Sequence, residues 1–455
     1  MRCYISFCVV SCSPMRRGVW VLVTVLIGST CVLAENADTR DRRHRAATSF
    51  HDGILLVHAK SQLDSTADGF RQDPYFYYFT GLQNTVGALF AIDGKSSESW
   101  LFLPSKPPFA KSGLQPEVAP GAEAVKQLGI EHVVDWSELE GFLARQASHL
   151  ARLYYVSDPT AYSELPPNLT SQKAPPEAPA WVQVILQKWP AFEVNEVSER
   201  VNALMAIQSA EETKALRSAA KATVTAMMAG LRAIRANVRQ RDVEAVVENA
   251  CWAAGARGSA FWPWAMAGEN AVFPHPFFSI ARYDHLNGIM RSGDLVRLDV
   301  GCEWDHYQGD LGRTVPVSGR YDDSQRETWN IFVAAYHAGV GALHDGVTED
   351  QVFEAWQKEL VKHRASATTL LAQHAIDSWS NRKNVPFWQV HTTNLLAAFP
   401  VGPLRAGTTI NFEPIASVDG QGFFLEDMFV INKDGAELLT PGVPYSAEDI
   451  EAAMH

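Results

Sequence analysis

Two stretches of the chain each carry a pair of acidic residues at a spacing that would bring them together. The first is VRLDVGCEWDHYQGDLGRT, residues 296–314, with Asp299 and Asp310. Apolar and polar residues alternate along its two arms, which is typical of β-strands. With a turn centred between positions 304 and 305, residue 299 would face residue 310, and facing Cβ atoms in a hairpin are about 4.5–5.5 Å apart. Two carboxylates at that distance repel, so the spacing predicts a cation or a proton between them.

The second stretch is NFEPIASVDGQGFFLEDMFVI, residues 411–431, with Glu413 and Glu426. Asp419-Gly420 is a strong signal for a two-residue hairpin turn. Counting outward from this turn, position 413 faces position 426. A single pair would also suit a solvated strand face, whereas two pairs predict one shared cluster of four carboxylates.

A cluster of this kind predicts hydrolysis assisted by two metal ions. Carboxylates bind hard divalent cations, and a histidine adds preference for zinc, manganese, cobalt or iron. Two ions about 3.5–4 Å apart activate a water and polarise a scissile carbonyl. The candidate histidines are His275, His285, His374 and His391. His275 and His391 precede the two hairpins, which makes them the stronger candidates, although spacing alone does not choose between them.

Other chemistries find less support in the sequence. The chain has no G-x-S-x-G motif for a serine hydrolase and no H-E-x-x-H motif. Glycosidases need only two carboxylates. The net charge of −12 argues against non-specific nucleic-acid binding, so we expect no nucleic-acid partner.

The N-terminus predicts export. Arg16 and Arg17 precede an apolar run and small residues that end at Ala34, which is the pattern of a signal peptide over residues 1–34. The apolar run is short for a membrane span, so we expect none in the mature chain, although an uncleaved anchor stays open. Either Met1 or Met15 could be the start. We therefore expect a periplasmic or secreted protein.

The leader holds four of the six cysteines and leaves Cys251 and Cys302. This count excludes a zinc site built from cysteines, and we expect no disulfide stapling of the mature chain. Residues 35–50 are polar and predict a flexible start.

Two domains are needed to position the acids. Residues 35–194 show short apolar runs alternating with polar and helical segments, which predicts an α/β domain. Within it, the proline-rich segment 157–180 predicts a surface loop. Residues 195–455 predict an α+β domain in which a helix pair followed by a hairpin occurs twice, as in a duplicated unit.

The helices of the second domain carry clear signals. Ser209 and Glu212 form a predicted capping box. An apolar stripe with helical spacing follows and predicts a core-facing helix: Leu216, Ala220, Val224, Met227, Leu231 and Ile234. A second pair is predicted over 325–345 and 348–378.

The motifs resemble the creatinase/aminopeptidase family with the "pita-bread" fold, and within it aminopeptidase P and prolidase. The resemblance covers nearly all of the mature chain. It is carried by FRQDPYFYYFTGLQNTVGALFAI in the first half, and by AMAGENAVFPHP, GDLVRLDVGCEWDHYQGDLGRTVPVSG, PLRAGTTINFEP and FFLEDMFVINKDGAELLT in the second. It implies a C-terminal pita-bread catalytic domain with duplicated helix-plus-antiparallel-sheet halves, preceded by an α/β creatinase-like domain.

The resemblance also implies a site. Asp299, Asp310, Glu413 and Glu426 would be metal ligands, with Asp310 and Glu426 bridging two ions. Asp299 would chelate one ion, and Glu413 would complete the shell of the other and shuttle the proton of the attacking water. His275 would contact the substrate or stabilise the tetrahedral intermediate. The ions would be manganese first, with zinc or cobalt as alternatives.

Three departures from the family pattern stand out, and one of them is an unusually short Asp-Gly hairpin. The family motif H-x-x-G-H, whose second histidine binds metal, is represented by HTTNL. In one register His391 matches the first histidine and Leu395 occupies the ligand position; in the other, His391 is itself the ligand. Many members carry arginine two positions before the last glutamate, where this chain has Phe424.

The resemblance implies a metallo-aminopeptidase that releases the N-terminal residue from peptides with proline at the second position, and a homo-oligomer. The alternatives are an impaired relative that binds a peptide or partner, because Leu395 replaces the ligand histidine, and a metal-free creatinase-type hydrolase. Four converging acids argue against both, because uncompensated buried carboxylates cost stability.

Overall fold

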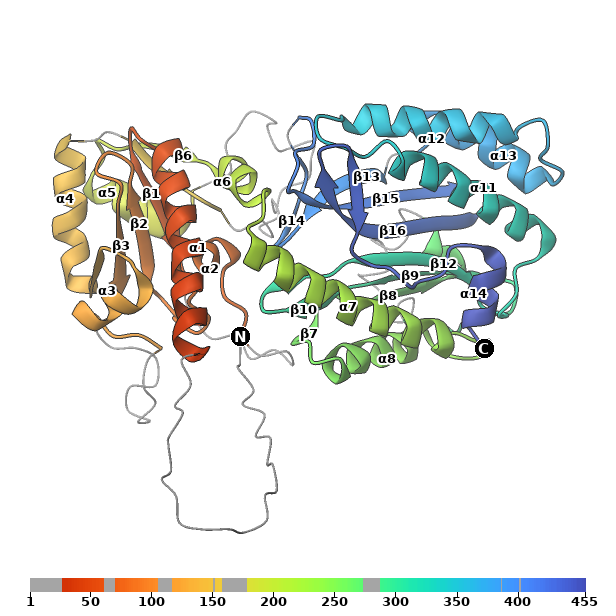
Figure 1. Cartoon of the computed structure of the whole chain (residues 1–455), viewed down its shortest axis with the longest axis horizontal. Coiled ribbons are helices and arrows are strands. Elements are labelled where there is room, and N and C mark those ends of the chain that lie inside the picture. Colours follow the sequence, from red (N-terminus) through yellow and green to blue (C-terminus); the bar gives the residue numbers. More distant parts are fainter. Residues whose placement is uncertain are drawn as a thin grey trace, which may run out of the picture. The chain divides into compact units, whose positions relative to one another are not determined.

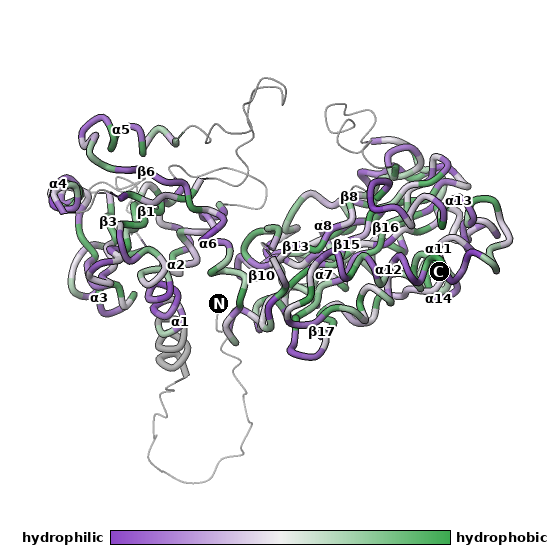
Figure 2. The backbone as a smooth tube through the Cα atoms, turned by 90° about the horizontal axis from the view of Figure 1, so that it is seen from above, coloured by the Kyte–Doolittle hydropathy of each residue, from purple (hydrophilic) through white to green (hydrophobic). Residues whose placement is uncertain are grey.

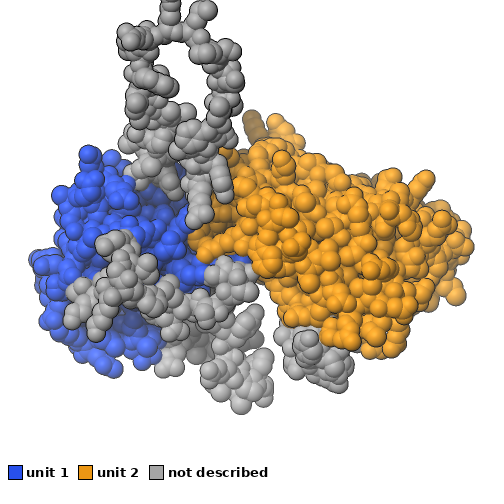
Figure 3. Space-filling model, turned by 90° about the horizontal axis from the view of Figure 1, so that it is seen from below, with its two compact units in different colours: residues 1–65, 70–198 blue, residues 66–69, 199–455 orange. Residues whose placement is uncertain are grey.

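The computed structural model describes residues 27–60, 70–104, 117–149, 152–157, 178–272, 287–385, 387–400 and 402–455, with side chains from residue 37. Within these residues the chain forms two compact units that divide between Ser198 and Glu199, coloured separately in Figure 3. Most of the predicted signal peptide and of the proline-rich segment lies outside the described residues. Among the described residues, no helix combines the length and apolar character needed to cross a membrane.

The first unit is built on a six-stranded mixed sheet in the order β4-β3-β2-β1-β5-β6. Strands β1 and β2 are antiparallel, whereas β5 pairs with β1 in parallel. The strands are β1 Ile54–His58, β2 Leu89–Asp93, β3 Glu98–Leu103, β4 His132–Asp135, β5 Arg152–Tyr155 and β6 Glu193–Glu196. The helices are α1 Ile27–Ser49, α2 Pro74–Thr80, α3 Ala122–Leu128, α4 Leu139–His149 and α5 Ala180–Lys188, with a 3-10 turn at Trp136–Glu138. This arrangement confirms the predicted α/β fold class.

Helix α1 corrects the prediction of a flexible start at 35–50. Its residues are largely hydrophilic (purple in Figure 2). This polar composition is the reason that the sequence predicted a flexible segment instead of a helix. Three of its polar residues, Thr39, Arg42 and Arg43, are nevertheless buried. Arg42 donates to the carbonyl oxygen of Tyr78 at 3.0 Å and Arg43 to that of Phe79 at 2.9 Å. These carbonyls belong to the last turn of α2, which lacks intrahelical partners, so the arginines join the two helices.

The second unit carries its helices in two groups. The first comprises α6 Ser198–Met205, which starts at the unit boundary, α7 Ala210–Ala233 and α8 Gln240–Ala253; the second comprises α11 Asp323–Val340, α12 Glu349–His363, α13 Leu370–Trp379 and the C-terminal α14 Ala447–Ala453. Ser209 and Glu212 form the predicted capping box of α7. The helix predicted over 348–378 is two helices, because a new one starts at the cap residue Thr369.

The helices pack on a large sheet in the order β14-β13-β15-β16-β12-β9-β8, with β17 also paired to β16 (Figure 1). Its strands are β8 Trp264–Ala267, β9 Leu295–Val300, β12 Leu311–Pro316, β13 Phe387–Thr393, β14 Ala397–Ala398, β15 Thr409–Val418, β16 Gln421–Asn432 and β17 Gly435–Leu438. A small sheet holds β7 Gly258–Ser259, β10 Cys302–Trp304 and β11 Tyr307–Gln308; short 3-10 turns lie at Gly268–Ala271 and Arg382–Asn384.

The register of the first hairpin differs from the prediction. Trp304 pairs with Tyr307, so the turn residues are Asp305 and His306, both with positive φ. Asp299 therefore faces Gly312 and not Asp310. Because 310 and 312 have the same parity on one strand, Asp310 still points to the face that carries Asp299 and is its diagonal neighbour.

The second hairpin has the predicted register. Val418 pairs with Gln421, and the same alignment continues to the pair Phe412–Asp427. Glu413 and Glu426 consequently lie at the same level of adjacent strands. An Asp-Gly turn allows the positive φ that Asp419 and Gly420 adopt.

Strand alternation separates a helix face from a cavity face of the large sheet. Leu298 packs against Gly230 of α7, where an added Cβ would lie 2.9 Å from its side chain. Phe412 packs in the same way against Gly339 of α11, at 2.7 Å. Residues next to these two, including Asp299 and Glu413, therefore point away from the helices.

A disulfide joins Cys251 of α8 to Cys302 of β10, with Cα atoms 5.5 Å apart. The expectation that the mature chain has no disulfide was wrong. Two cysteines 51 residues apart gave no sequence signal for their proximity. The packing of α8 beside β10 brings them together, and both side chains are fully buried.

Candidate metal centre

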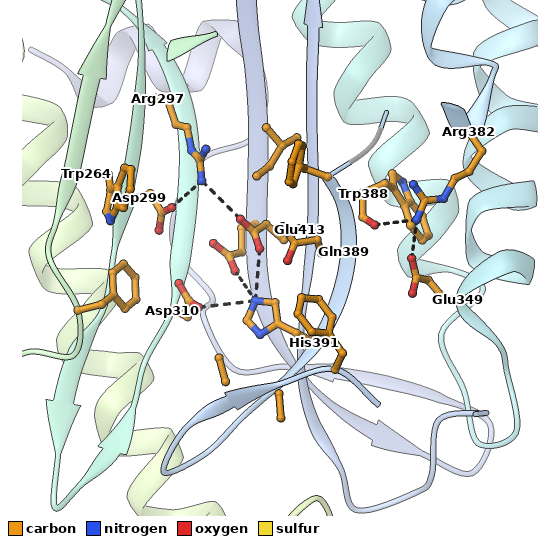
Figure 4. Close-up of a pocket in the computed structure, with 17 residues that line it drawn as sticks. Trp264, Arg297, Asp299, Asp310, Glu349, Arg382, Trp388, Gln389, His391 and Glu413 are labelled. Carbon is orange, nitrogen blue, oxygen red and sulfur yellow. Dashed lines mark hydrogen bonds and ion pairs between the residues drawn. The ribbon is translucent and has the colours of Figure 1, made fainter. Parts of the chain in front are cut away.

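Five side chains converge on the cavity face of the large sheet, four from β9, β13, β15 and β16 and one from Asp310, directly before β12 (Figure 4). The Nε2 atom of His391 lies 3.8 Å from Asp310 Oδ2, 3.3 Å from Glu413 Oε2 and 3.4 Å from Glu426 Oε1. Asp299 stands on β9 beside this group. The structure thus brings together the four acids and one histidine that the sequence singled out.

The five residues form two groups whose ligand atoms could each hold one cation. One group is Asp310, His391 and Glu426, and the other is Asp299, Glu413 and Glu426. Within each group the ligand atoms lie within 4.8 Å of one another, and all are buried. Because Glu426 belongs to both groups, a single carboxylate could bridge two ions.

The sequence left two alignments open for the histidine, and the geometry favours the one in which His391 is itself a ligand. His391 points into the carboxylates from β13, with 6% of its surface exposed. Its Nδ1 lies 3.2 Å from the carbonyl oxygen of Thr392 and 3.4 Å from Thr393 Oγ1. A contact of this kind fixes the ring and leaves Nε2 for a metal. Leu395 is buried and is not among the described residues that line the cavity.

Asn411 and Arg297 are residues of the site that the sequence reasoning missed. Asn411 Nδ2 donates to Glu426 Oε1 at 2.9 Å and to the carbonyl oxygen of Asp310 at 3.0 Å. Arg297 Nη2 donates to Asp299 Oδ2 at 2.9 Å. Each residue stands two positions before a predicted ligand, so the period-two rule for strands would have placed both on the same face.

Burial and mutual repulsion raise the pKa values of three carboxyl groups. Desolvation raises the pKa of Asp299 to about 6, against the opposing charge of Arg297. Desolvation and then neighbouring carboxylates hold the pKa values of Asp310 and Glu426 well above their usual range. Burial alone would lower the pKa of His391, but its hydrogen bond to Glu413 and the charges of Glu413 and Asp310 outweigh it and raise the pKa to about 9.

These residues fit a divalent-metal centre. The Oε2 atom of Glu426 is buried and has no hydrogen-bond partner within the described part of the chain. A buried carboxylate oxygen without a donor is costly, and a cation would satisfy it. The set of four carboxylates and one imidazole matches the ligand preferences of manganese, zinc or cobalt.

The cluster forms one side of a cavity of about 690 Å³. Aromatic residues of this cavity are Phe261, Trp264, Phe387, Trp388 and Phe399. Figure 4 shows Arg382 and Glu349, joined at 2.8 Å, on the other side of the cavity from Asp299. A cavity of this size suits a short peptide or a small ligand.

Other residues that the sequence proposed fall elsewhere. His275, His285, Phe277 and Phe278 lie outside the described residues. His374 is exposed and lies 2.6 Å from Asp419 at the tip of the second hairpin. Of the two tryptophans proposed for the cleft, Trp264 lines the cavity, whereas the indole of Trp262 donates to Glu244 and is not among the lining residues.

Two family models match the chain. The description "Metallopeptidase family M24" matches residues 214–433, and "Aminopeptidase P, N-terminal domain" matches residues 39–154. Both matches agree with the order of the two units. The described part of each match carries the fold reported above.

Individual relatives extend this similarity over most of the chain. A Xaa-Pro aminopeptidase of Escherichia coli is 25% identical over 439 residues, which cover 88% of this chain and 93% of the relative. A probable Xaa-Pro aminopeptidase of Botryotinia fuckeliana is 27% identical over 268 residues, and the match spans only 44% of that longer protein. The structure of E. coli aminopeptidase P with the inhibitor Pro-Leu has a TM-score of 0.74 at 23% identity, covering 92% of this chain and 98% of that one.

Proposed function

We propose that this chain, which matches metallopeptidase family M24 over residues 214–433 and an aminopeptidase P N-terminal domain over residues 39–154, is a metal-dependent aminopeptidase. It would release the N-terminal residue of peptides with proline at the second position. The observation that carries this proposal is the pair of buried ligand groups that share Glu426 at the edge of one cavity. Relatives over most of the chain are named Xaa-Pro aminopeptidases, which supports the same substrate class.

The ligand assignment of this proposal is Asp299, Asp310, His391, Glu413 and Glu426. Two divalent ions, when bound, supply an activated water and a polarised scissile carbonyl. Manganese is proposed first, with zinc or cobalt as alternatives, because the donor set is mostly carboxylate with one imidazole.

The residues of the chain have distinct proposed tasks. Glu413 accepts the proton of the attacking water and returns it to the leaving amine, because its Oε2 faces the cluster beside His391. His391 holds its place in the cluster through Thr392 and Thr393. His275, outside the described residues, keeps its proposed role as a substrate contact. The aromatic cavity walls exclude water and offer apolar surface to a proline ring.

The location of the protein is a proposal too. We propose export, periplasmic or secreted, through the signal peptide over residues 1–34. The Cys251–Cys302 bond supports this, because disulfides persist in oxidising compartments. N-terminal sequencing of protein recovered outside the cytoplasm should begin at Glu35; recovery from the cytoplasm with the leader intact would contradict it. A homo-oligomer is also proposed, and light scattering tests it.

The first experiment measures metal content and peptide hydrolysis on the chain from Glu35. We expect about two ions per chain and release of the first residue from an X-Pro tripeptide, lost with a chelator and restored by Mn²⁺. The matched control is the same tripeptide with alanine in place of proline. Tight metal binding without turnover of either peptide would favour an impaired relative that binds peptides, and absence of metal binding would contradict the proposed function.

A further inference from the structure

Arg297 is a buried cation at the metal centre, and the proposed function assigns it no role. Only 6% of its surface is exposed. Its Nη2 donates to Asp299 Oδ2 at 2.9 Å and lies 3.5 Å from Glu413 Oε1. The two acids come from different strands, β9 and β15, and both belong to one candidate ligand group. The arginine therefore links the two carboxylates that this group does not share with the other.

The guanidinium rests on the ring of Phe424, with its Cζ atom 4.2 Å from the ring centroid. Phe424 stands on β16 two positions before Glu426, so both side chains point to the cavity face. Gly312, which faces Asp299, makes room for the ring, because an added Cβ at that position would overlap it. Residues of two neighbouring strands, Phe424 on β16 and Gly312 on β12, thus form the site in which the Arg297 guanidinium lies.

The other ligand group is held differently. His391 is oriented by Thr392 and Thr393. Asn411 binds the shared Glu426 and the backbone of Asp310. Among the described residues, the ion pairs of Arg297 are with Asp299 and Glu413, neither of which belongs to this group. The two groups consequently depend on different supports.

We propose that Arg297, seated on Phe424, is a positioning residue for the metal position formed by Asp299, Glu413 and Glu426, and that the position at His391 does not depend on it. This inference rests on the proposed metal centre. Contacts from one guanidinium nitrogen to two carboxylates restrain their separation, and supporting hydrogen bonds of this kind change metal affinity about 10–100-fold. The ring of Phe424 then supports a cation that is supplied by β9.

The test is calorimetric titration of the metal-stripped chain with Mn²⁺, which reads the two positions separately without relying on activity. In Arg297→Met we expect one class of sites to weaken about 10–100-fold while the other stays within about twofold of the parent. The double variant R297F/F424R returns an arginine to the cavity face from β16, and we expect it to recover most of the lost affinity. A purely structural role for Arg297 predicts no such selectivity and no such recovery.

The matched control is Arg241→Met. Arg241 also lies over an aromatic ring, that of Trp262, at 4.8 Å and pairs with a buried carboxylate, Glu244, at 2.8 Å. It is not among the described residues that line the cavity. We expect both classes of sites to be unchanged in this variant.

Several outcomes would overturn the inference. Parent-like binding at both positions in Arg297→Met would do so, as would equal weakening of both positions, or equal weakening in the Arg241 control. If Arg297→Met fails to fold, Arg297→Lys decides, because lysine keeps the charge but lacks the planar guanidinium that lies on the Phe424 ring; two parent-like classes would then overturn the inference. A parent chain that binds no Mn²⁺ would instead contradict the proposed function.

Discussion

The position of His391 decides which of the two possible alignments describes the candidate metal site. Its imidazole occupies the place among the acids where the sequence left a choice between His391 and Leu395. The two positions are four residues apart, and β13 ends at Thr393, between them. Strand geometry therefore directs the first side chain into the cluster, while the second lies beyond the strand.

Separate replacement of His391 and Leu395 tests the assignment of His391 as the metal ligand. We expect His391→Ala to lose one bound ion and to reduce turnover of an X-Pro peptide by at least about 100-fold, because a ligand is removed. Leu395→Ala should keep both ions, with a stability cost of about 2–5 kcal/mol for a truncated buried leucine. Metal analysis and urea unfolding measure the two effects. Retention of both ions in His391→Ala would favour the other alignment, in which His391 is not a ligand.

Metal binding should depend on pH, because the raised pKa values mean that protons occupy the metal-free cluster. The pKa of Asp299 is raised to about 6, and those of Asp310 and Glu426 lie well above their usual range. Acids with raised folded-state pKa values bind more protons when folded, so the stability of the metal-free chain falls as pH rises above about 4. The raised pKa of His391 acts in the same direction, up to its value of about 9.

Metal ions must displace these protons, so we expect the rise in melting temperature on adding Mn²⁺ to be larger at about pH 7.5 than at about pH 5.5. Thermal melts with and without Mn²⁺ measure this, and a weakly buffered solution should acidify on metal addition. An equal rise at both pH values, without proton release, would contradict it.

At the scale of elements, close approaches between strands and helices set the positions of the ligands. Gly230 and Gly339 let α7 and α11 approach Leu298 and Phe412 on the helix face. The neighbouring residues then project toward the cavity with little freedom. Gly312 has the corresponding task within the sheet, because it admits the ring of Phe424.

Gly312→Ala should disturb the metal centre without changing any ligand. An added methyl group would overlap the Phe424 ring, and overpacking of this kind costs about 1–3 kcal/mol. Gly435→Ala is the matched control, because a Cβ on this β17 residue meets nothing within 4 Å and its φ is not positive. Urea unfolding and Mn²⁺ titration of both variants measure the difference, and equal behaviour would contradict it.

An ion pair on the helix face fixes β12 to β16 beneath the metal centre. Arg313 and Asp427 are fully buried, with Nη2 donating to Oδ1 at 3.1 Å. Arg313 also donates to the backbone oxygen of Glu426 at 2.8 Å. Tyr336 and Thr440 donate to Asp427 as well.

Removing one partner of this pair should strongly destabilise the second unit. For Arg313→Met we expect a loss of about 3–5 kcal/mol, because an uncompensated buried carboxylate remains. The control is Arg217→Met, whose pair with Glu437 is half exposed, with an expected change below about 1 kcal/mol. Urea unfolding compares them; a loss in Arg313→Met no larger than in the control would argue against this role.

At the scale of the whole molecule, the disulfide links α8 to β10, which is part of the first hairpin. It closes a loop across a sequence separation of 51 residues, which includes β8 and β9. Closing such a loop restricts the unfolded chain. The bond therefore stabilises the half of the second unit that supplies Asp299 and Asp310.

The double variant C251A/C302A should lower the free energy of unfolding by about 2–4 kcal/mol relative to the oxidised parent. Thiol labelling of the denatured chain from Glu35 should detect free cysteines only after reduction. Urea unfolding of the parent with and without reductant gives an independent measurement. Free thiols in the unreduced parent would show that the bond does not form.

The sequence by itself predicted the acids that could bind metal and much of the local structure. Side-chain type and the Asp-Gly turn predicted Glu413 opposite Glu426, and the capping box predicted the start of α7. Both depend on neighbours within a hairpin or a helical turn, where local geometry suffices. The resemblance to the family and the fold class that it implies came from longer sequence motifs in both domains.

Only the tertiary structure decided which distant residues meet. The first hairpin turn lies at Asp305 and His306, a pair with no strong turn signal, so its register could not be counted from the sequence. Arg297 over Phe424, and Cys251 beside Cys302, depend on contacts between elements far apart in the chain. Such contacts are fixed by the packing of whole strands and helices, which no short stretch of sequence encodes.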